Sequence, residues 1–339
     1  MPFLRKQHVV LLLLAAVNFI TFAQQLDDAI PSVKMKLKTP KYLQSGDSIA
    51  IVAPAGILKD KEELIHQAKQ LAEQWGLKVI IGKHVFNQYH HFAGSDQERT
   101  SDFQAALDNP NIKAIWAARG GYGSVRIIDR LDFKVFKQSP KWIIGYSDIT
   151  ALHSHVSNLG VESIHAIMGT SMLFDAEEAA KSKETLRKVL FGEELHYEIP
   201  SSAYNITGNA KGQLVGGNLS ILASMLGSES QLDTKNKILF IEEIGEYKYA
   251  IDRMLQSLKR AGYFQHLQGL VIGDISNIKV NTTKWGSSIE RLILDATSDY
   301  NFPIVFGFPA GHEPDNRALI LGRTVELNVT KTVSKVFFE

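Results

Sequence analysis

The chain has 339 residues, of which 45% are hydrophobic and 22% charged, so it is expected to be globular with about two domains rather than disordered or fibrous. Lys and Arg total 37 against 36 for Asp and Glu, which gives a net charge of +1. This charge is too small to create the positive potential that attracts a nucleic-acid backbone. We therefore expect a small-molecule partner. The sequence has no cysteine, which excludes disulfides, thiolate nucleophiles and cysteine-ligated metals.

The first residues have the pattern of a secretory signal peptide. Arg5 and Lys6 precede an apolar run over 9–17 that is shorter than the roughly 20 residues of a membrane helix. We expect cleavage after Ala23, with an uncleaved anchor as the alternative. Loss of 1–23 removes two cations and no acid, so the net charge changes from +1 to −1. A cysteine-free exported chain suits a bacterial periplasm, without stable membrane insertion after cleavage.

Beyond a polar tether over 24–43, the first half alternates buried-strand patterns with helical ones. This alternation predicts an α/β domain with a mostly parallel sheet flanked by helices. Ser95 and Glu98 have the spacing of a helix capping box. The expected strands are 48–53, 77–81, 114–117, 142–145 and 162–167, and the expected helices are 61–75, 95–107, 125–131 and 148–157.

A charged stretch over 176–194 and a turn-rich stretch over 200–212 separate the two halves. We place the boundary near residue 195, which gives an N-terminal α/β domain over 44–195 and a C-terminal α/β domain over 196–339. A turn at Gly216 and Gly217 is expected before a helix over 219–226. The other expected elements are strands 237–241, 270–272 and 304–306, helices 249–261 and 288–297, and a terminal antiparallel sheet of 319–321, 325–329 and 333–338.

The segment WIIGYSDIT places Ser147 where a buried strand turns abruptly into a helix. At such a turn the serine hydroxyl points out of the backbone, close to backbone N–H groups that have no partner. This is the geometry of a nucleophile elbow. The usual G-x-S-x-G is incomplete, because Asp148 is followed by Ile149. Ser147 is therefore either a nucleophile or an N-cap of the helix.

Three glycines follow the strand 114–117 in the segment AARGGYGS. Glycine permits backbone conformations that bring N–H groups close to a ligand, so this loop is suited to an oxyanion or a phosphate. The spacing departs from G-x-G-x-x-G and lacks a P-loop lysine, which makes a nucleotide site a weak interpretation. A plain tight turn is the alternative.

The segment ILFIEEIGEYKYAID places Glu242, Glu243 and Glu246 at the carboxyl end of a buried strand, where open α/β sheets bind their ligands. One of these carboxylates could orient a histidine. The alternative is a charged loop at a helix start, where Glu246 would interact favourably with the helix dipole.

His312 lies in a loop rich in glycine and proline, FGFPAGHEPDN, after the strand 304–306. Histidine is the side chain best suited to shuttle a proton near neutral pH. The other candidates are His90, His91, His153, His155 and His165. His153 and His155 are two positions apart and point away from each other on a helix, so a metal site is not expected.

Taken in order, these segments resemble the LD-carboxypeptidase family of serine peptidases, which includes the microcin-immunity peptidases. The resemblance covers nearly all of 45–330. It rests on IAIVAPAG, FAGSDQERTSDFQAAL, AARGGYG, GYSDITALH, GGNLSIL, FIEEIGEYKYAIDRML and GFPAGH. It implies an N-terminal domain bearing the serine and a C-terminal domain bearing a glutamate and a histidine, with the active site between them.

Carried over by motif, the resemblance implies that Ser147 is the nucleophile and His312 the general base, with Glu242 orienting the histidine. Glu246 remains possible in place of Glu242. The backbone N–H groups of Asp148 and Gly121 would form the oxyanion hole. Candidates for binding the substrate, including its carboxylate, are Arg119, Asn218 and Arg253.

The implied reaction is hydrolysis, through an acyl-enzyme and without metal or cofactor, of the amide joining the L-centre of a diamino acid to terminal D-alanine in murein tetrapeptides. The chain departs from the family in its signal peptide, in the FGF before PAGH and in the HAIMG after Glu162. Two alternatives remain: a peptidase that cleaves a peptide-nucleotide antibiotic, and an exported protein that binds a wall peptide without cleaving it. A homodimer is possible, because members of this family are often dimers.

Overall fold

The computed structural model describes residues 37–174 and 177–339. The expected signal peptide and most of the expected tether lie outside the described residues. Residues 37–43, which the sequence analysis assigns to the tether, are packed on the fold, since the Lys38 N–H donates to the Gly160 carbonyl at 2.8 Å and the Leu43 N–H to the Leu190 carbonyl at 2.8 Å. Within the described ranges, we find no helix that is both long and apolar enough to span a membrane.

The first half forms a six-stranded sheet in the order β11-β5-β4-β3-β1-β2, which is parallel except for β11. The strands are β1 (Ser48–Val52), β2 (Lys78–Ile81), β3 (Ile112–Ala117), β4 (Trp142–Gly145), β5 (Ser163–His165) and β11 (Leu319–Leu321). The helices are α2 (Glu62–Gln74), α3 (Asp96–Asp108), α4 (Ser124–Ile127), α5 (Lys134–Gln138), α6 (Thr150–Asn158) and α7 (Ala180–Phe191). The capping box at Ser95 and Glu98 is confirmed at the start of α3.

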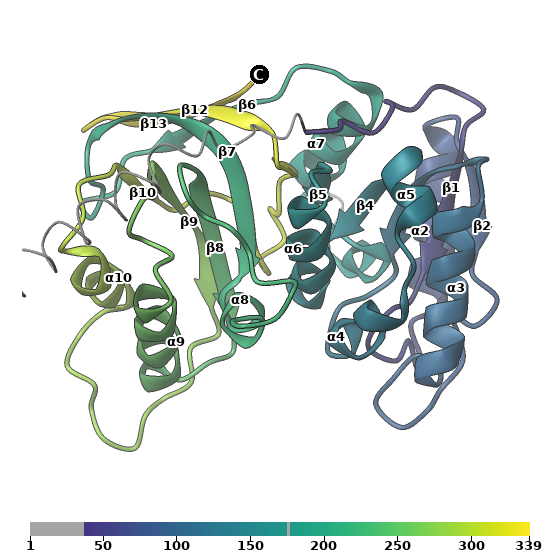
Figure 1. Ribbon diagram of the computed structural model, residues 1–339, viewed down its shortest axis with the longest axis horizontal. Helices are drawn as coiled ribbons and strands as arrows, with labels where there is room; N and C mark the ends of the chain where they lie inside the picture. Colours follow the sequence, from purple (N-terminus) through teal and green to yellow (C-terminus); the bar gives the residue numbers. More distant parts are fainter. Residues whose placement is uncertain (1–36, 175–176) are drawn as a thin grey trace, which may run out of the picture. The chain divides into compact units, whose positions relative to one another are not determined.

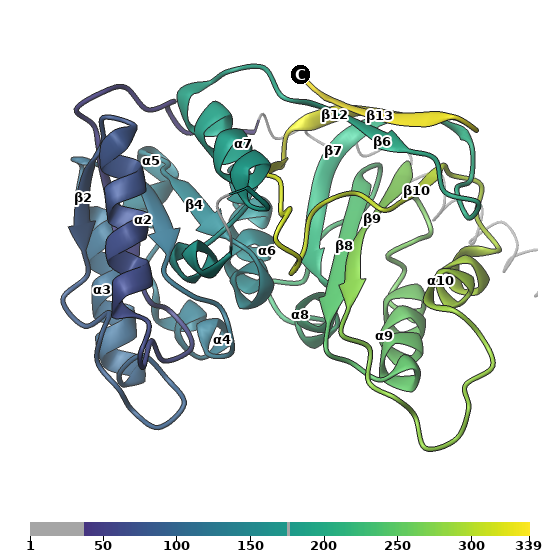
Figure 2. The same ribbon diagram turned by 180° about the vertical axis from the view of Figure 1, so that it is seen from behind.

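Helices α2 and α3 cover opposite faces of this sheet, as the two views in Figures 1 and 2 show. Successive residues of β1 point to opposite faces, so Ile49 packs in the same cluster as Ile65 of α2, whereas Ala50 packs with Phe103 of α3. Burial on both faces explains why the strands appear in the sequence as continuous apolar runs.

The second half forms a seven-stranded sheet in the order β10-β9-β8-β7-β12-β13-β6. Its strands are β6 (His196–Pro200), β7 (Gly208–Asn218), β8 (Ile238–Ile244), β9 (Gly269–Ser276), β10 (Ile304–Phe306), β12 (Thr324–Val329) and β13 (Val333–Phe338), and its helices are α8 (Leu219–Ser224), α9 (Lys248–Arg260) and α10 (Ile289–Thr297). Strands β7 to β10 are parallel, and β12, β13 and β6 extend the sheet in antiparallel fashion. The expected α/β fold class is confirmed.

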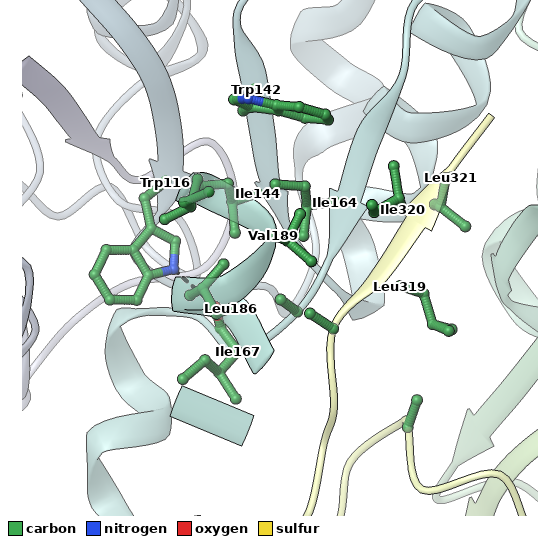
Figure 3. Close-up of a cluster of buried hydrophobic side chains, with 14 of the residues drawn as sticks. Trp116, Trp142, Ile144, Ile164, Ile167, Leu186, Val189, Leu319, Ile320 and Leu321 are labelled. Atoms are coloured by element: carbon green, nitrogen blue, oxygen red, sulfur yellow. Dashed lines mark hydrogen bonds between the residues drawn. The ribbon is translucent and has the colours of Figure 1, made fainter. Parts of the chain in front are cut away.

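One of the three expected terminal strands belongs to the other sheet. Leu319–Leu321 pairs antiparallel with β5, so the chain returns to the first half before β12 and β13. Figure 3 shows Leu319, Ile320 and Leu321 beside Ile164, with Leu186 and Val189 of α7 in the same buried cluster. All three residues of β11 are buried, and a short apolar strand does not encode which sheet edge it completes.

In the middle of the chain, one helix was not predicted from the sequence, and the turn expected at Gly216 and Gly217 was wrong. The stretch 176–194 contains α7, because Leu186, Val189 and Leu190 form a narrow buried face on an otherwise charged helix. Gly216 and Gly217 do not form a turn but lie within β7, paired with Phe240 and Ile241. A Cβ at Gly216 would lie 1.9 Å from the Phe240 carbonyl oxygen, so close approach of the two backbones requires glycine there.

Candidate active site

Ser147 lies in a strained turn between β4 and α6. Tyr146 is extended, whereas Ser147 has a φ of 60°, and a single turn of 3₁₀-helix (Ser147–Ile149) leads into α6. A residue with a Cβ in this left-handed region costs about 1–2 kcal/mol, so the surrounding packing must hold the turn in place. The strain places the serine side chain at the end of the strand instead of within it, as in a nucleophile elbow.

The alternative role for Ser147, an N-cap, is not what the structure shows. The residues at the two N-cap positions are Tyr146 for the 3₁₀ turn and Ile149 for α6, and neither helix start has a capping hydrogen bond from a side chain. The Ser147 side chain is half-buried and is not used to begin the helix.

The glycine segment 120–123 lies directly against Ser147. A Cβ at Gly120 would lie 3.1 Å from the Ser147 Cβ and 3.4 Å from its Oγ. Gly121 and Gly123 have φ values of 99° and 145°, which residues with a Cβ rarely adopt. The glycines therefore let the loop after β3 approach the serine closely, and helix α4 that follows is a single turn.

Glu242 and His312 form a hydrogen-bonded pair at the carboxyl end of β8. The distance from His312 Nδ1 to Glu242 Oε2 is 2.8 Å, and the two side chains are 12% and 0% exposed. An imidazole that donates from Nδ1 to a carboxylate keeps Nε2 free to accept a proton. Burial lowers the pKa of His312, but the Glu242 hydrogen bond and the charges of Glu242, Glu243 and Asp274 outweigh it and raise the pKa.

The other two glutamates of this segment have different partners. Glu243 accepts from the Ser220 N–H at 2.7 Å, the Ser220 hydroxyl at 2.6 Å and the Asn218 amide at 3.2 Å, which ties β8 to α8. Glu246 offers its backbone carbonyl to the Lys279 N–H at 3.0 Å. Because successive side chains of a strand point to opposite faces, Glu243 turns toward α8 and Glu242 toward His312.

Residues adjacent to Ser147 contact the second sheet. The Tyr146 and His312 rings lie 4.9 Å apart edge to face, and the Thr150 hydroxyl accepts from the Asn218 N–H at 2.9 Å. These contacts bring the turn after β4 to the loop bearing His312. The structure thus gathers Ser147, the glycine segment and the Glu242–His312 pair in one region.

Comparisons with known proteins identify the family of this chain. A family model for the LD-carboxypeptidase N-terminal domain matches residues 49–166, and a model for the LD-carboxypeptidase C-terminal domain matches 211–327. A probable murein peptide carboxypeptidase of Bacillus subtilis (strain 168) is 33% identical over 300 residues, which are 88% of this chain and 93% of that protein. The chain belongs to the LD-carboxypeptidase family.

Two other relatives, one of them a solved structure, extend the comparison. The murein tetrapeptide carboxypeptidase of Pseudomonas aeruginosa is 28% identical, covering 82% of this chain and 92% of that protein. The crystal structure of muramoyltetrapeptide carboxypeptidase from Oxalobacter formigenes superposes with a TM-score of 0.78 at 28% identity, covering 86% and 98% of the two chains.

MccF in complex with glutamyl sulfamoyl guanosine has a TM-score of 0.79 at 20% identity and covers 90% of this chain and 99% of that one, which shows a shared fold. Membership in the family makes the chain a serine-type carboxypeptidase.

In this carboxypeptidase, the three expected substrate-binding residues lie in different surroundings. Arg119 hydrogen-bonds the Ile57 carbonyl and lies next to Gly56, beside the glycine segment. Arg253 stacks on the Tyr249 ring, 5.4 Å from its centroid. Asn218 is buried, caps α8 by accepting from the Ile221 N–H, and donates to Glu243, so its side chain has a structural use.

Each of the other candidate histidines is either buried among other residues or exposed on a loop. His153 is buried between the Ser163 hydroxyl and the Gly145 carbonyl, each at 2.9 Å, and burial lowers its pKa to about 4. His155 contacts Ser230, and burial lowers its pKa. His165 is fully buried beside Phe240. His90 and His91 lie on an exposed loop.

In the described part of the chain, no cluster of three His, Asp or Glu is placed to hold a metal ion.

Two residues near the site were not singled out from the sequence. Asp274, on β9, has a side-chain oxygen that is buried without a partner, and burial first, then neighbouring carboxylates, raise its pKa to about 6. Arg99, on α3, is buried against the glycine segment. The signal for Arg99 is its spacing, because residues 99, 103 and 106 share the buried face of the helix.

Proposed function

We propose that this carboxypeptidase hydrolyses the amide between the L-centre of a diamino acid and the terminal D-alanine of murein tetrapeptides, using Ser147, Glu242 and His312. The observation that carries the proposal is the Glu242–His312 hydrogen bond beside the strained Ser147 turn. Relatives named for murein peptides at 28–33% identity support the substrate class.

The first half of the reaction forms an acyl-enzyme. Ser147 Oγ attacks the carbonyl carbon while its proton passes to His312 Nε2, and Glu242 stabilises the imidazolium. The oxyanion accepts hydrogen bonds from the N–H groups of Gly121 and Asp148. When the C–N bond breaks, the amine of D-alanine leaves with the proton from His312.

The second half releases the tripeptide. His312 takes a proton from water, whose oxygen attacks the ester carbonyl, and the proton then returns to Ser147 Oγ as the C–O bond breaks. A carboxypeptidase also needs a group for the substrate carboxylate. Of the two candidate arginines, Arg119 is the one beside the glycine segment, so we assign it that contact.

The test is release of free D-alanine from a murein tetrapeptide by the purified chain, with and without chelator. We expect release that survives chelator, is lost in Ser147→Ala, and persists in Ser139→Ala, which changes an exposed serine in the same half of the chain. A tetrapeptide ending in L-alanine should not be cleaved. Tight binding of the tetrapeptide without release, equal in wild type and Ser147→Ala, would overturn the enzymatic proposal in favour of a wall-peptide binding protein.

A further inference from the structure

The buried guanidinium of Arg99 connects two backbone segments beside the site. Its side chain is 0% exposed, and Nη1 donates to the carbonyls of Pro54, in the turn after β1, and of Gly123 at 3.0 Å. Nη2 pairs with Asp96, and the guanidinium lies 4.8 Å above the Phe92 ring. A buried cation is tolerated only where such partners replace water, so breaking its contacts with the loop carbonyls would leave the charge poorly compensated.

The carboxylate of Asp148, the residue after Ser147, contacts the other end of the same loop. Its Oδ2 accepts from the Ser124 N–H at 2.8 Å, and Asp148 is 1% exposed. Burial raises the pKa of Asp148, while hydrogen bonds from Ser124 and Gly123 and the charge of Arg99 act in the opposite direction. Arg99 and Asp148 thus approach the end of the glycine segment from opposite sides of its backbone, one binding a carbonyl and the other an N–H.

A third contact orients one peptide group of the loop. The Gly56 N–H donates to the Gly120 carbonyl at 3.0 Å. Among the described residues every peptide bond is trans, so the N–H of Gly121 points opposite to the Gly120 carbonyl. It therefore points away from Gly56, while the α-carbon of Gly120 faces Ser147.

We propose that Arg99 and the Asp148 carboxylate are positioning residues that fix the 123–124 peptide at the end of the glycine segment, while the Gly56 N–H holds the 120–121 peptide, so that the Gly121 N–H faces the substrate oxygen at Ser147. This inference rests on the proposed function, which makes that N–H an oxyanion donor. Three glycines in four residues give the loop many alternative conformations, including one in which the peptide is flipped and presents its carbonyl instead. The Gly56 contact opposes the flip directly, and the Arg99 and Asp148 contacts oppose it by fixing the far end of the loop, so the N–H is oriented before substrate binds. Such preorganisation is the source of oxyanion stabilisation.

The main test compares Arg99→Lys with Arg126→Lys. Arg126 shares two partners of Arg99, since it pairs with Asp96 and lies 5.2 Å above Phe92, but its side chain is 45% exposed. Its backbone N–H donates to the Gly123 carbonyl, which a substitution of the side chain leaves in place, and its guanidinium donates to Asp96 instead of a loop carbonyl. Lysine at 99 keeps the charge but lacks the planar guanidinium that binds two carbonyls through Nη1 and Asp96 through Nη2 at once. We expect kcat per titrated serine to fall by about 10²-fold in Arg99→Lys, as for loss of one oxyanion donor, with KM within about two-fold. Arg126→Lys should match wild type.

A second variant covers the case in which Arg99→Lys fails to fold. Gly56 lies outside the left-handed region, so alanine is tolerated there by the backbone, but its Cβ would lie 2.9 Å from the Gly120 oxygen and push that peptide aside. Gly56→Ala should lower kcat and weaken binding of a phosphonate transition-state analogue by similar factors, while binding of the tripeptide product stays unchanged. Equal kcat in both folded variants and wild type would overturn the positioning role and leave the proposed function intact.

A readout without catalysis separates the two proposals. Amide hydrogen exchange at Gly123 and Ser124, whose N–H groups hydrogen-bond to the Asp148 carboxylate, should speed up at least ten-fold in Arg99→Lys or Gly56→Ala relative to Arg126→Lys. If wild type releases no D-alanine yet these amides lose protection, the proposed function fails while the loop restraint holds. Unchanged exchange in both variants would overturn the restraint itself.

Discussion

The two halves of the molecule prepare their parts of the site in different ways. The N-terminal half uses backbone conformation, with Ser147 at a φ of 60° and the glycine segment packed against it. The C-terminal half uses charged side chains, with the Glu242–His312 pair at the end of β8, where the pairing with β9 shifts register between Ile241 and Glu243. The serine and the oxyanion donors need exact placement, whereas the histidine needs a tuned proton affinity, so strain suits the first half and electrostatics the second.

This comparison also predicts which property a substitution in each part of the site should change. A change in the Glu242–His312 pair should alter proton affinity and rate with little loss of stability. A change in the N-terminal turn should alter stability in a way that depends on backbone conformation. The following predictions run from the largest expected effect to the smallest.

Glu242→Gln should lower kcat by about 10⁴-fold, the cost of removing the carboxylate charge in a serine triad, because glutamine can hold His312 in the wrong tautomer. In wild type, kcat/KM should rise with pH as His312 loses its proton, with a midpoint above the ordinary imidazole value of about 6.5. Removing the charge that raises this pKa should lower the midpoint in Glu242→Gln. pH–rate profiles measure both effects.

Glu246→Gln is the matched control, because Glu246 lies in the same segment without contacting His312 through any hydrogen bond found in the described residues. Its midpoint should equal that of wild type. A lowered midpoint in Glu246→Gln, with Glu242→Gln unchanged, would transfer the role to Glu246 and contradict the observed pairing.

Gly217→Ala should reduce the free energy of unfolding by about 3 kcal/mol or more, since overpacking adds to backbone strain. Its φ is 147°, and a Cβ there would lie 2.4 Å from the Thr150 Oγ1 of α6, at the contact between the two halves. Urea unfolding of Gly217→Ala and Gly227→Ala separates the cost of overpacking from the cost of backbone strain. Gly227 has a φ of 78°, but a Cβ there would have nothing within 4 Å, so its variant carries the strain alone. Equal losses in the two variants would show that the contact with Thr150 costs nothing.

Ser147→Gly should be more stable than Ser147→Ala by about 1 kcal/mol, although both lack the hydroxyl and should be inactive. Glycine relieves the left-handed strain, whereas alanine retains it. The same pair at Ser101, in the exposed middle of α3, should show the opposite order by a similar amount. Thermal or urea unfolding of the four variants tests this. If Ser147→Ala is more stable than Ser147→Gly, which is the order expected at Ser101, the Ser147 turn is unstrained.

Asp274→Asn should increase stability above pH 6 but not at pH 4, by less than about 1 kcal/mol because solvent screens a half-buried group. Burial raises the pKa of Asp274 to about 6, so the unfolded chain loses this proton at lower pH than the folded one. This group therefore makes stability fall as pH rises toward 6, and a neutral asparagine removes the effect. A stability difference from wild type that does not change between pH 4 and 8 would contradict the raised pKa.

By itself, the sequence determined the α/β class and most strands and helices, because hydrophobic periodicity and the residue types of turns are local properties. Short segments also made Ser147 and His312 candidates, as a serine at a strand-to-helix turn and a histidine in a glycine-rich loop, and the resemblance to the LD-carboxypeptidase family then singled them out as the expected nucleophile and base.

Only the tertiary structure shows that Glu242, and not Glu243 or Glu246, hydrogen-bonds His312, because this pairing depends on which face of β8 meets a histidine 70 residues away. Only the tertiary structure also shows which sheet β11 joins, because either sheet could accept this apolar tripeptide. It alone shows the contacts of Arg99, because the two carbonyls that accept from its side chain come from separate loops. Long-range pairing depends on the packing of whole elements, and no short window of sequence contains that information.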